Sequence, residues 1–227
     1  MAKYKLRQFA ELETFSNVVH QVQQDEHVPD HNIKGRWRSD FFLREGLLTL
    51  ELGCGKGEYT LALAENSPDR LFIGVDLKGN RLWRGALTAN QQRLLNAGFL
   101  RCKIENLKSV FAPSEIDEIW ITFPDPQPGL KREKKRLTGV NFLEMYREIL
   151  KPGGLIHLKT DSKEFYSFSK QMASEHGIIS YCSEDLYHEI TDLNNEEYRL
   201  LTGVKTFYEK KFLAQGMPIC YLRFSLV

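Results

Sequence analysis

The sequence predicts an α/β protein of the Rossmann-like, doubly wound type, with a mostly parallel sheet of about seven strands and helices on both faces. From residue 47 onward, short apolar runs alternate with segments of helical periodicity, a pattern typical of a parallel sheet covered by helices. The turn Gly53-x-Gly55-x-Gly57 joins the first run to the first helix. Glycine has no Cβ, so such a turn lets the backbone lie against a flat, nucleoside-like ligand.

The remaining elements follow from hydrophobic periodicity and from turn residues. A helix near residue 150 is expected to end sharply at Lys151-Pro152-Gly153-Gly154, because glycine and proline commonly follow a helix. Further strands are expected after residue 178. The expected strands are 47–52, 71–76, 99–103, 116–123, 155–160 and 219–226, and the expected helices are 57–66, 79–97, 138–150, 162–175 and about 203–214.

Length and composition indicate one large core. The 227 residues are 42% hydrophobic and 27% charged, which is ordinary for a globular protein. We expect a single domain over residues 35–227. Residues 1–34 are polar and basic with scattered aromatics, and are expected to form an arm ordered only in part, on the domain or on a partner. Composition leaves a monomer and a homodimer equally open.

Several classes of protein are disfavoured by the sequence. No apolar run approaches the roughly 20 residues of a membrane span, and no apolar segment follows the basic start as in a secretory signal. The cysteines lie far apart, without a Cys-x-x-Cys pair, which argues against a metal site or a disulfide framework and fits reduced thiols in the cytoplasm. The four cysteines are Cys54, Cys102, Cys182 and Cys220.

Two carboxylates follow the first two predicted strands. Glu51 lies directly before the glycine turn, where it would repel a phosphate and attract a cation such as the sulfonium of S-adenosylmethionine. Asp76 ends the next apolar run, at the position where an α/β nucleotide fold hydrogen-bonds a ribose diol. Asp76 also suits the N-cap of a helix starting near Gly79. The third glycine comes one residue too early for a dinucleotide fingerprint, which disfavours a nicotinamide dehydrogenase.

A stiff loop follows the strand 116–123. Three prolines bracket Asp125 in the sequence Pro124-Asp125-Pro126-Gln127-Pro128, and proline restricts both its own backbone and that of the preceding residue. The segment Lys131–Arg136 comes next and carries five positive charges against one negative. A carboxylate at the crevice beside a cationic segment suggests a catalytic site that opens onto a phosphate backbone. Taken alone, Asp125 could be a turn former and the segment 131–136 a solvated face.

These motifs together resemble the bacterial tRNA (guanine-N7-)-methyltransferases, within the class I S-adenosylmethionine-dependent methyltransferase superfamily. The resemblance spans about residues 35–227. The glycine loop is generic to the superfamily, whereas the Phe-Pro-Asp-Pro loop and the Thr-x-Tyr-Glu-x-Lys-Phe ending are far more specific. It rests on Glu51-Leu-Gly-Cys-Gly-Lys-Gly, Phe123-Pro-Asp-Pro, Lys134-Lys-Arg-Leu, Lys159-Thr-Asp and Thr206-Phe-Tyr-Glu-Lys-Lys-Phe.

The resemblance implies transfer of a methyl group from S-adenosylmethionine to N7 of a guanosine in the variable loop of tRNA. It implies that Asp125 is catalytic and lies at the cofactor. The cofactor-binding residues that it implies, including the three glycines of the loop, are Glu51, Gly53, Gly55, Gly57, Asp76 and Asp125. Asp161 and the span Thr206 to Glu209 match positions that bind the substrate nucleotide.

The sequence departs from the family pattern at three places. Gln127 stands where the family usually has Trp, and Gly129 where it has a substrate-contacting Lys, so Lys131 is the nearest replacement cation. An acidic cofactor contact is expected near strand 99–103, where the family often has Asp-Ala and this chain has Lys103-Ile-Glu105. Glu105, or the neighbouring backbone, is the candidate for that contact.

Guanine N7 carries a free lone pair, so the reaction needs no general base, and positioning is expected to dominate catalysis. A carboxylate that accepts from guanine N1–H and N2 would leave N7 exposed. Asp161 and Glu209 are the two candidates, and the sequence does not rank them. Two alternative functions remain open: a methyltransferase of small molecules or proteins, and a tRNA-binding scaffold that has lost its chemistry.

Overall fold

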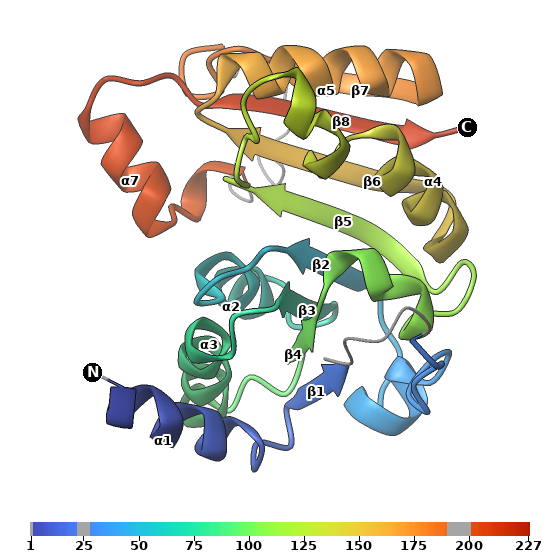
Figure 1. Ribbon diagram of the computed structural model, residues 1–227, viewed down its shortest axis with the longest axis vertical. Helices are drawn as coiled ribbons and strands as arrows, with labels where there is room; N and C mark the ends of the chain where they lie inside the picture. The colour runs from blue at the N-terminus through green and yellow to red at the C-terminus, as the bar shows by residue number, and fades with distance from the viewer. Residues whose placement is uncertain (1, 22–27, 190–200) are drawn as a thin grey trace.

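The structure is a computed structural model, and it describes residues 2–21, 28–189 and 201–227. Its strands form one sheet in the order β1-β4-β3-β2-β5-β6-β8-β7 (Figure 1). Neighbouring strands from β1 to β6 run parallel, and β8 runs antiparallel to both β6 and β7. The strands are β1 (Val18–Gln21), β2 (Leu48–Leu52), β3 (Leu71–Asp76), β4 (Ala97–Cys102), β5 (Ile116–Thr122), β6 (Leu150–Thr160), β7 (Gly177–Ser183) and β8 (Cys220–Leu226).

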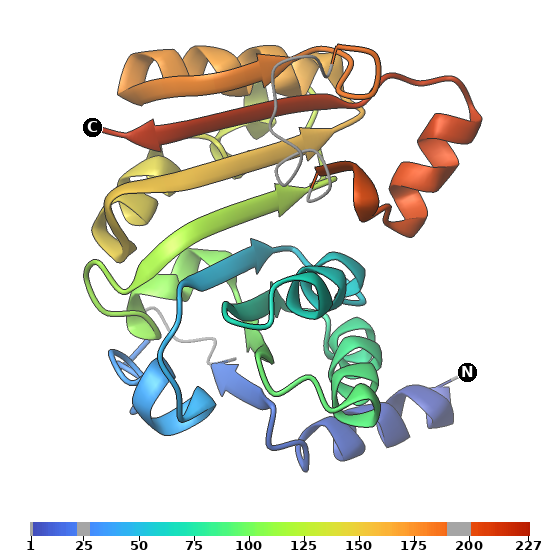
Figure 2. The ribbon, with the colours of Figure 1, turned by 180° about the vertical axis from the view of Figure 1, so that it is seen from behind.

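Helices cover both faces of this sheet, as Figures 1 and 2 show from opposite sides. The α-helices are α1 (Ala2–Leu12), α2 (Glu58–Asn66), α3 (Gly79–Gln92), α4 (Val140–Ile149), α5 (Lys163–His176) and α7 (Phe207–Ala214). Shorter helical segments are η1 (Trp37–Phe42), η2 (Ile104–Ser109) and η3 (Leu130–Lys135). The predicted fold class is confirmed.

The core has two layers because residues alternate across the strands. Leu48, Leu50 and Leu52 of β2 pack with side chains of α4, α5 and η1. On the opposite face, Phe72 and Phe99 pack with the apolar sides of α1, α2 and α3. Strands buried on both faces explain why the sequence shows near-continuous apolar runs for them.

The N-terminal segment extends the sheet, which holds eight strands within the described residues where about seven were expected. Val18 of β1 is in register with Phe99 of β4, and α1 lies beside α3 in both views. A four-residue strand such as Val18–Gln21, in which the two valines are adjacent, has too little alternation to be recognised from sequence. The division of the chain at residue 34 stays a prediction.

Two predicted boundaries were wrong. Helix α3 ends at Gln92, before the expected residue 97, because Arg93 adopts a left-handed backbone with φ 57° and its N–H caps the helix on Ala89 O and Asn90 O. Helix α4 ends at Ile149, next to the Pro-Gly-Gly connection as expected, but the strand expected from residue 155 begins at Leu150, so the connection falls within β6. The register between β5 and β6 shifts between Ile116 and Glu118, and this irregularity accommodates the connection as a bulge.

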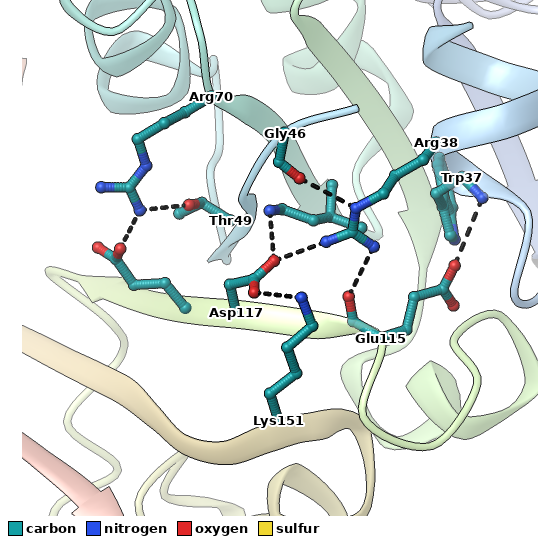
Figure 3. A network of polar contacts seen from close by, with 10 residues as sticks. Trp37, Arg38, Gly46, Thr49, Arg70, Glu115, Asp117 and Lys151 are labelled. Atoms are coloured by element: carbon teal, nitrogen blue, oxygen red, sulfur yellow. Dashed lines mark hydrogen bonds and ion pairs between the residues drawn. The ribbon is translucent and has the colours of Figure 1, made fainter. Parts of the chain in front are cut away.

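Charged groups at the amino edge of the sheet are internally paired (Figure 3). Asp117, at the start of β5, accepts from Arg38 Nη2 at 2.6 Å, from Lys151 Nζ at 2.6 Å and from Leu48 N at 2.8 Å. The guanidinium of Arg38 also donates to Gly46 O and to Glu115 O. These bonds join η1, β2, β5 and β6, and they leave the opposite, carboxyl edge of the sheet for ligands.

Candidate functional site

A cleft of about 350 Å³ opens at the carboxyl edge of the sheet, where ligands bind in open α/β folds. Its walls come from the ends of β2 and β5, the glycine loop, the first turns of α2 and α3, and the start of α7. The lining residues are Glu51, Gly53, Cys54, Gly55, Lys56, Glu58, Tyr59, Arg81, Thr122, Phe123, Thr206, Phe207 and Tyr208.

The three loop glycines serve two different needs. All have positive φ, at 74° for Gly53, 58° for Gly55 and 70° for Gly57. A Cβ on Gly53 or Gly55 would meet nothing within 4 Å, so these two keep open space beside the cleft. A Cβ on Gly57 would lie 2.6 Å from Phe99 Cε1. Gly57 is therefore required by close packing, and the other two by backbone conformation.

Glu51 lies at the floor of the cleft and is only 3% exposed. Its Oε1 accepts from Thr122 Oγ1 at 2.6 Å, and its Oε2 accepts from Thr60 N at 2.8 Å and from Thr60 Oγ1. Burial raises the pKa of Glu51 to about 7, against the lowering effect of these hydrogen bonds. A buried carboxylate whose partners are all neutral is suited to a cationic ligand.

Asp76 lies behind the glycine loop. Its Oδ2 accepts from Gly55 N at 3.0 Å and its Oδ1 from Lys78 N at 2.7 Å. The carboxylate thus ties β3 to the loop and to the start of α3. Asp76 is half-buried and is not among the residues that line the cleft.

Asp125 is exposed in the loop after β5, beside the cleft residue Phe123. Its Oδ1 accepts from Gln127 N at 3.1 Å, which forms an Asx turn. The backbone bends sharply on both sides of it, with positive φ at Phe123 (46°) and Gln127 (47°). Arg136 Nε donates to Gln127 O at 3.3 Å and so anchors the loop.

Arg136 differs from the other cations of the segment 131–136. It is 3% exposed and donates to Glu164 of α5 at 2.6 Å. Its guanidinium also lies 4.5 Å from the ring centroid of Phe168. Arg136 is therefore structural, whereas Lys131, Arg132, Lys134 and Lys135 are exposed. Lys131 does not line the cleft.

Helix α7 closes one side of the cleft. Thr206 caps it, with Oγ1 accepting from Glu209 N at 3.2 Å. The next residue, Phe207, donates its N–H to Glu58 Oε2 at 2.6 Å. This bond joins α7 to α2 across the cleft, although the two helices are far apart in the sequence.

Glu209 is not among the residues that line the cleft. It is fully buried, and its Oε1 lies 2.5 Å from Nζ of the equally buried Lys159 and 2.8 Å from the donating hydroxyl of Tyr187. Lys159 Nζ also donates to Leu201 O at 2.8 Å. Burial lowers the pKa of Lys159, against the attraction of Glu209. The pair fixes the first turn of α7 to β6.

Asp161 follows β6 directly and is half-buried. Its carboxylate is within reach of its own backbone amide and has no partner from another residue in the described ranges. Burial raises the pKa of Asp161 above its ordinary value. The carboxylate of Asp161 is therefore partly accessible to a ligand, whereas Glu209 is fully buried, although its Oε2 has no hydrogen-bond partner in the described ranges.

Glu105 is exposed in η2 and lines a different groove, between η2, η3 and α4, together with Lys134 and Lys135. The structure therefore does not bring Glu105 to the cleft. Sequence reasoning missed Tyr59, Arg81 and Thr122, which do line it. Thr122 could have been found, because it ends the strand next to Glu51, while Tyr59 and Arg81 carry no motif.

The described ranges hold no group of three His, Cys, Asp or Glu side chains arranged to bind a metal ion. Over the same ranges, every helix is too short or too polar to cross a membrane.

Known proteins resemble this chain along nearly its whole length. Residues 45–222 match the family model described as "Putative methyltransferase". The tRNA (guanine-N(7)-)-methyltransferase of Christiangramia forsetii is 44% identical over 99% of both chains. The enzyme of the same name from Bacteroides fragilis is 42% identical over 100% of this chain and 87% of its own.

Solved structures share the fold at low sequence identity. The 16S rRNA methyltransferase KamB superposes with a TM-score of 0.60 at 16% identity, over 92% of this chain and 98% of its own. A 30S ribosomal A1408 methyltransferase from an uncultured bacterium gives 0.57 at 16% identity, over 82% and 90%. The full-length identities go further than the fold and show that this chain belongs to the tRNA (guanine-N(7)-)-methyltransferase family.

Proposed function

We infer that this protein is an enzyme that transfers a methyl group from S-adenosylmethionine to N7 of a guanosine in tRNA. Its family membership over the whole chain supports this reaction. The observation that carries the residue assignments is the cleft itself, in which a glycine loop with open space lies against the buried carboxylate of Glu51. We further propose that the modified guanosine lies in the variable loop and that the protein acts in the cytoplasm.

The residues of the cleft fit S-adenosylmethionine. Tyr59 lines the cleft, and its buried hydroxyl has no hydrogen-bond partner in the described ranges, so a donor or acceptor is required there. Glu51 would hold the cationic end of the cofactor, and Gly53 and Gly55 would lie against it. When bound, S-adenosylmethionine supplies an electrophilic methyl group on a sulfonium. Asp76 holds the loop by accepting a hydrogen bond from Gly55 N, and we propose that it also contacts the ribose.

Between the two candidates for gripping the guanine base, we propose Asp161. Guanine N1–H and N2 are parallel donors that match one carboxylate. The carboxylate of Asp161 is half-buried at the carboxyl end of β6 and unclaimed by other described residues. Glu209 instead holds Lys159, and Thr206 caps α7 at the cleft wall. We propose that Glu209 orients Thr206 and Tyr208 and does not contact the base.

No side chain has to remove a proton, because guanine N7 is already a free base. The protein therefore acts by alignment, which can contribute several kcal/mol to a lowered barrier. We propose that Asp125 is the catalytic carboxylate, presented by the loop that Arg136 anchors. Its negative charge beside the cleft would stabilise the positive charge that develops on the purine. Lys131 and its exposed neighbours would bind phosphates of the tRNA.

The test is to incubate the protein with unmodified tRNA and methyl-labelled S-adenosylmethionine, then to reduce the RNA and treat it with aniline, which cleaves at N7-methylguanosine. We expect cleavage at one variable-loop guanosine. Asp125→Ala should lower the rate at least hundredfold, roughly 3 kcal/mol in the barrier. Asp69→Ala, an exposed Asp at the amino edge, is the matched control and should retain activity.

Other outcomes would redirect the assignment. Label in the RNA without cleavage would mean a different target atom, and absence of label would favour a small-molecule substrate or an inactive scaffold. For the base contact, Asp161→Asn should lose methylation while it keeps cofactor binding. An Asp161→Asn variant that methylates tRNA at the normal rate would return the role to Glu209.

A further inference from the structure

A second, larger groove continues from the cofactor cleft along the helices α1, α2 and α3. Its volume is about 950 Å³, and it shares Lys56, Glu58 and Arg81 with the cleft. The groove is therefore contiguous with the cleft. The residues that line it are Lys5, Gln8, Lys56, Glu58, Leu61, Asn80, Arg81, Trp83, Arg84 and Thr88.

The groove is strongly cationic. Lys5, Lys56, Arg81 and Arg84 are all exposed, and none of them has a carboxylate within ion-pair distance in the described ranges. Its one acidic side chain, Glu58, is engaged by the N–H of Phe207. Some exposed cations elsewhere are paired, as Lys108 is with Glu148 at 2.7 Å. Four unpaired cations in one groove favour a polyanionic ligand.

The groove has fixed walls, because α1 is attached to α3 by specific contacts. Trp83 Nε1 of α3 donates to Glu11 Oε2 of α1 at 3.0 Å. Phe9 of α1 packs so closely on Gly79 that a Cβ there would lie 2.5 Å from the Phe9 ring. The guanidinium of Arg101 lies over the Phe9 ring, 4.9 Å from its centroid. The cations of α1 and α3 are thus held on facing walls.

We propose that this α1–α3 groove binds the sugar-phosphate backbone of the same tRNA whose guanosine enters the cleft. The proposal rests on the proposed function and adds a second contact surface to it. The groove lies along α1, α2 and α3 on one face of the sheet, and the exposed Lys134 and Lys135 of η3 lie beside α4 on the other face, so the RNA would be held from both faces. Its contacts position the substrate and are independent of base sequence.

The experiment measures the affinity of full-length protein for unmodified tRNA as a function of salt, in the presence of S-adenosylhomocysteine. Lys5→Ala/Arg84→Ala removes two groove cations that do not line the cofactor cleft. Loss of two phosphate contacts should lower the slope of log K against log salt by about two and weaken binding by about tenfold or more at low salt. Arg93→Ala/Lys170→Ala is the matched control.

The control removes the same charge from the far end of α3 and from α5 on the opposite face of the sheet. It should leave the salt slope unchanged. An unchanged slope in Lys5→Ala/Arg84→Ala, or an equal drop in the control, would overturn the proposal and mean that the groove serves another partner or none. Both variants should bind S-adenosylhomocysteine like the unmodified protein, which confirms folding.

The two proposals fail in different ways. If the unmodified protein methylates tRNA but Lys5→Ala/Arg84→Ala keeps the full salt slope, the groove assignment is wrong and the reaction stands. If the unmodified protein neither binds nor methylates tRNA, the proposed function is wrong and the groove assignment falls with it.

Discussion

Two buried glutamates on neighbouring strands show how differently the two edges of the sheet are built. Glu118 lies near the start of β5 and is 8% exposed, while Glu51 lies near the end of β2 and is 3% exposed. Burial raises the pKa of both, yet His157 and Arg70 outweigh it at Glu118 and lower that pKa to about 2. At Glu51 the partners are neutral, and the pKa is raised to about 7.

The difference between these two pKa values reflects whether a buried carboxylate is paired with cationic side chains of the protein or is left for a ligand. At the amino edge, Arg70 pairs with Glu118, and Arg38 and Lys151 pair with Asp117 (Figure 3). In such pairs each charge has a partner, and removal of one partner leaves the other uncompensated, which is destabilising. At the carboxyl edge, the donors to Glu51 among the described residues are hydroxyl and amide groups. None of these groups is a cation, so the negative charge of Glu51 is left for a cationic ligand.

The largest expected effect is at the amino edge. Glu118→Ala leaves the guanidinium of Arg70 and the ring of His157 without their carboxylate, so we expect the free energy of unfolding to fall by about 3 kcal/mol. Urea denaturation at pH 7 measures it, with Glu144→Ala on the exposed side of α4 as control. Cofactor affinity of the folded variant should be unchanged.

This contribution has a defined pH dependence. Because the folded pKa of Glu118 lies below its unfolded value of 4.5, its stabilisation is present above pH 4.5 and is lost as the pH falls towards 2. The difference in unfolding free energy between Glu118→Ala and the unmodified protein should decrease as the pH falls over that range. A difference that stays constant across it would show that burial and packing, and no ion pair, account for the loss.

The glycine loop separates packing from conformation at the carboxyl edge. Gly57→Ala meets both a positive φ and the ring of Phe99, so we expect a loss of about 2 kcal/mol of unfolding free energy. Gly53→Ala meets only the positive φ and should lose about 1 kcal/mol. Thermal denaturation of the two variants side by side tests this order, and equal losses would contradict it.

A smaller change is expected from Glu51→Gln, and it should appear in binding. At pH 8 we expect the affinity for S-adenosylmethionine to fall about tenfold, or roughly 1.4 kcal/mol, because the carboxylate charge is gone while its shape remains. Calorimetric titration measures it, with Glu118→Gln as the matched control on the next strand. Unaltered affinity in Glu51→Gln would mean that Glu51 does not contact the cationic end of the cofactor.

Glu51→Gln should weaken cofactor binding, but its stability relative to the unmodified protein should improve as the pH rises. The folded pKa of Glu51 lies above its unfolded value, so its contribution is fully present below pH 4.5 and is lost as the pH rises through about 7. The unfolding free energy of Glu51→Gln relative to the unmodified protein should therefore improve by roughly 1 kcal/mol between pH 6 and pH 8.

The smallest expected effect is the pH dependence of cofactor binding by the unmodified protein. Protonation of Glu51 below a pKa of about 7 removes the charge that attracts the cation. The dissociation constant for S-adenosylmethionine should rise by about fourfold between pH 8 and pH 6.5, and Glu51→Gln should flatten this profile. A profile that survives in Glu51→Gln would assign the titration to another group.

Sequence predicted the elements that carry strong hydrophobic patterns. Strands β2, β3, β5 and β8 match because buried strands read as apolar runs. Strand β1 and helix α1 were not predicted. They are held by β4 and α3, which lie far along the chain, and a four-residue strand leaves no local pattern to detect. Helix α1 does have an apolar side, so its periodicity could have been recognised.

The same limit applies to the site. Glu51, Gly53 and Gly55 line the cleft, at the carboxyl edge where the strand-turn-helix pattern predicted a ligand site. Their contact with the cofactor stays a prediction. Glu209 shows what sequence could not give: its burial and its bond to Lys159 depend on how α7 docks on β6. Glu105 follows β4 as expected, but η2 turns it towards α4 and away from the cleft.

The short strand β1 has a practical consequence for handling the protein. It covers β4, which would otherwise be the edge strand of the sheet. A truncation that removed residues through Gln21 would leave the backbone N–H and C=O groups of β4 free to pair with another chain, and open edges of that kind promote aggregation. Shortened variants should therefore keep this strand, and affinity tags are better tested at either terminus for their effect on the monodispersity of the preparation.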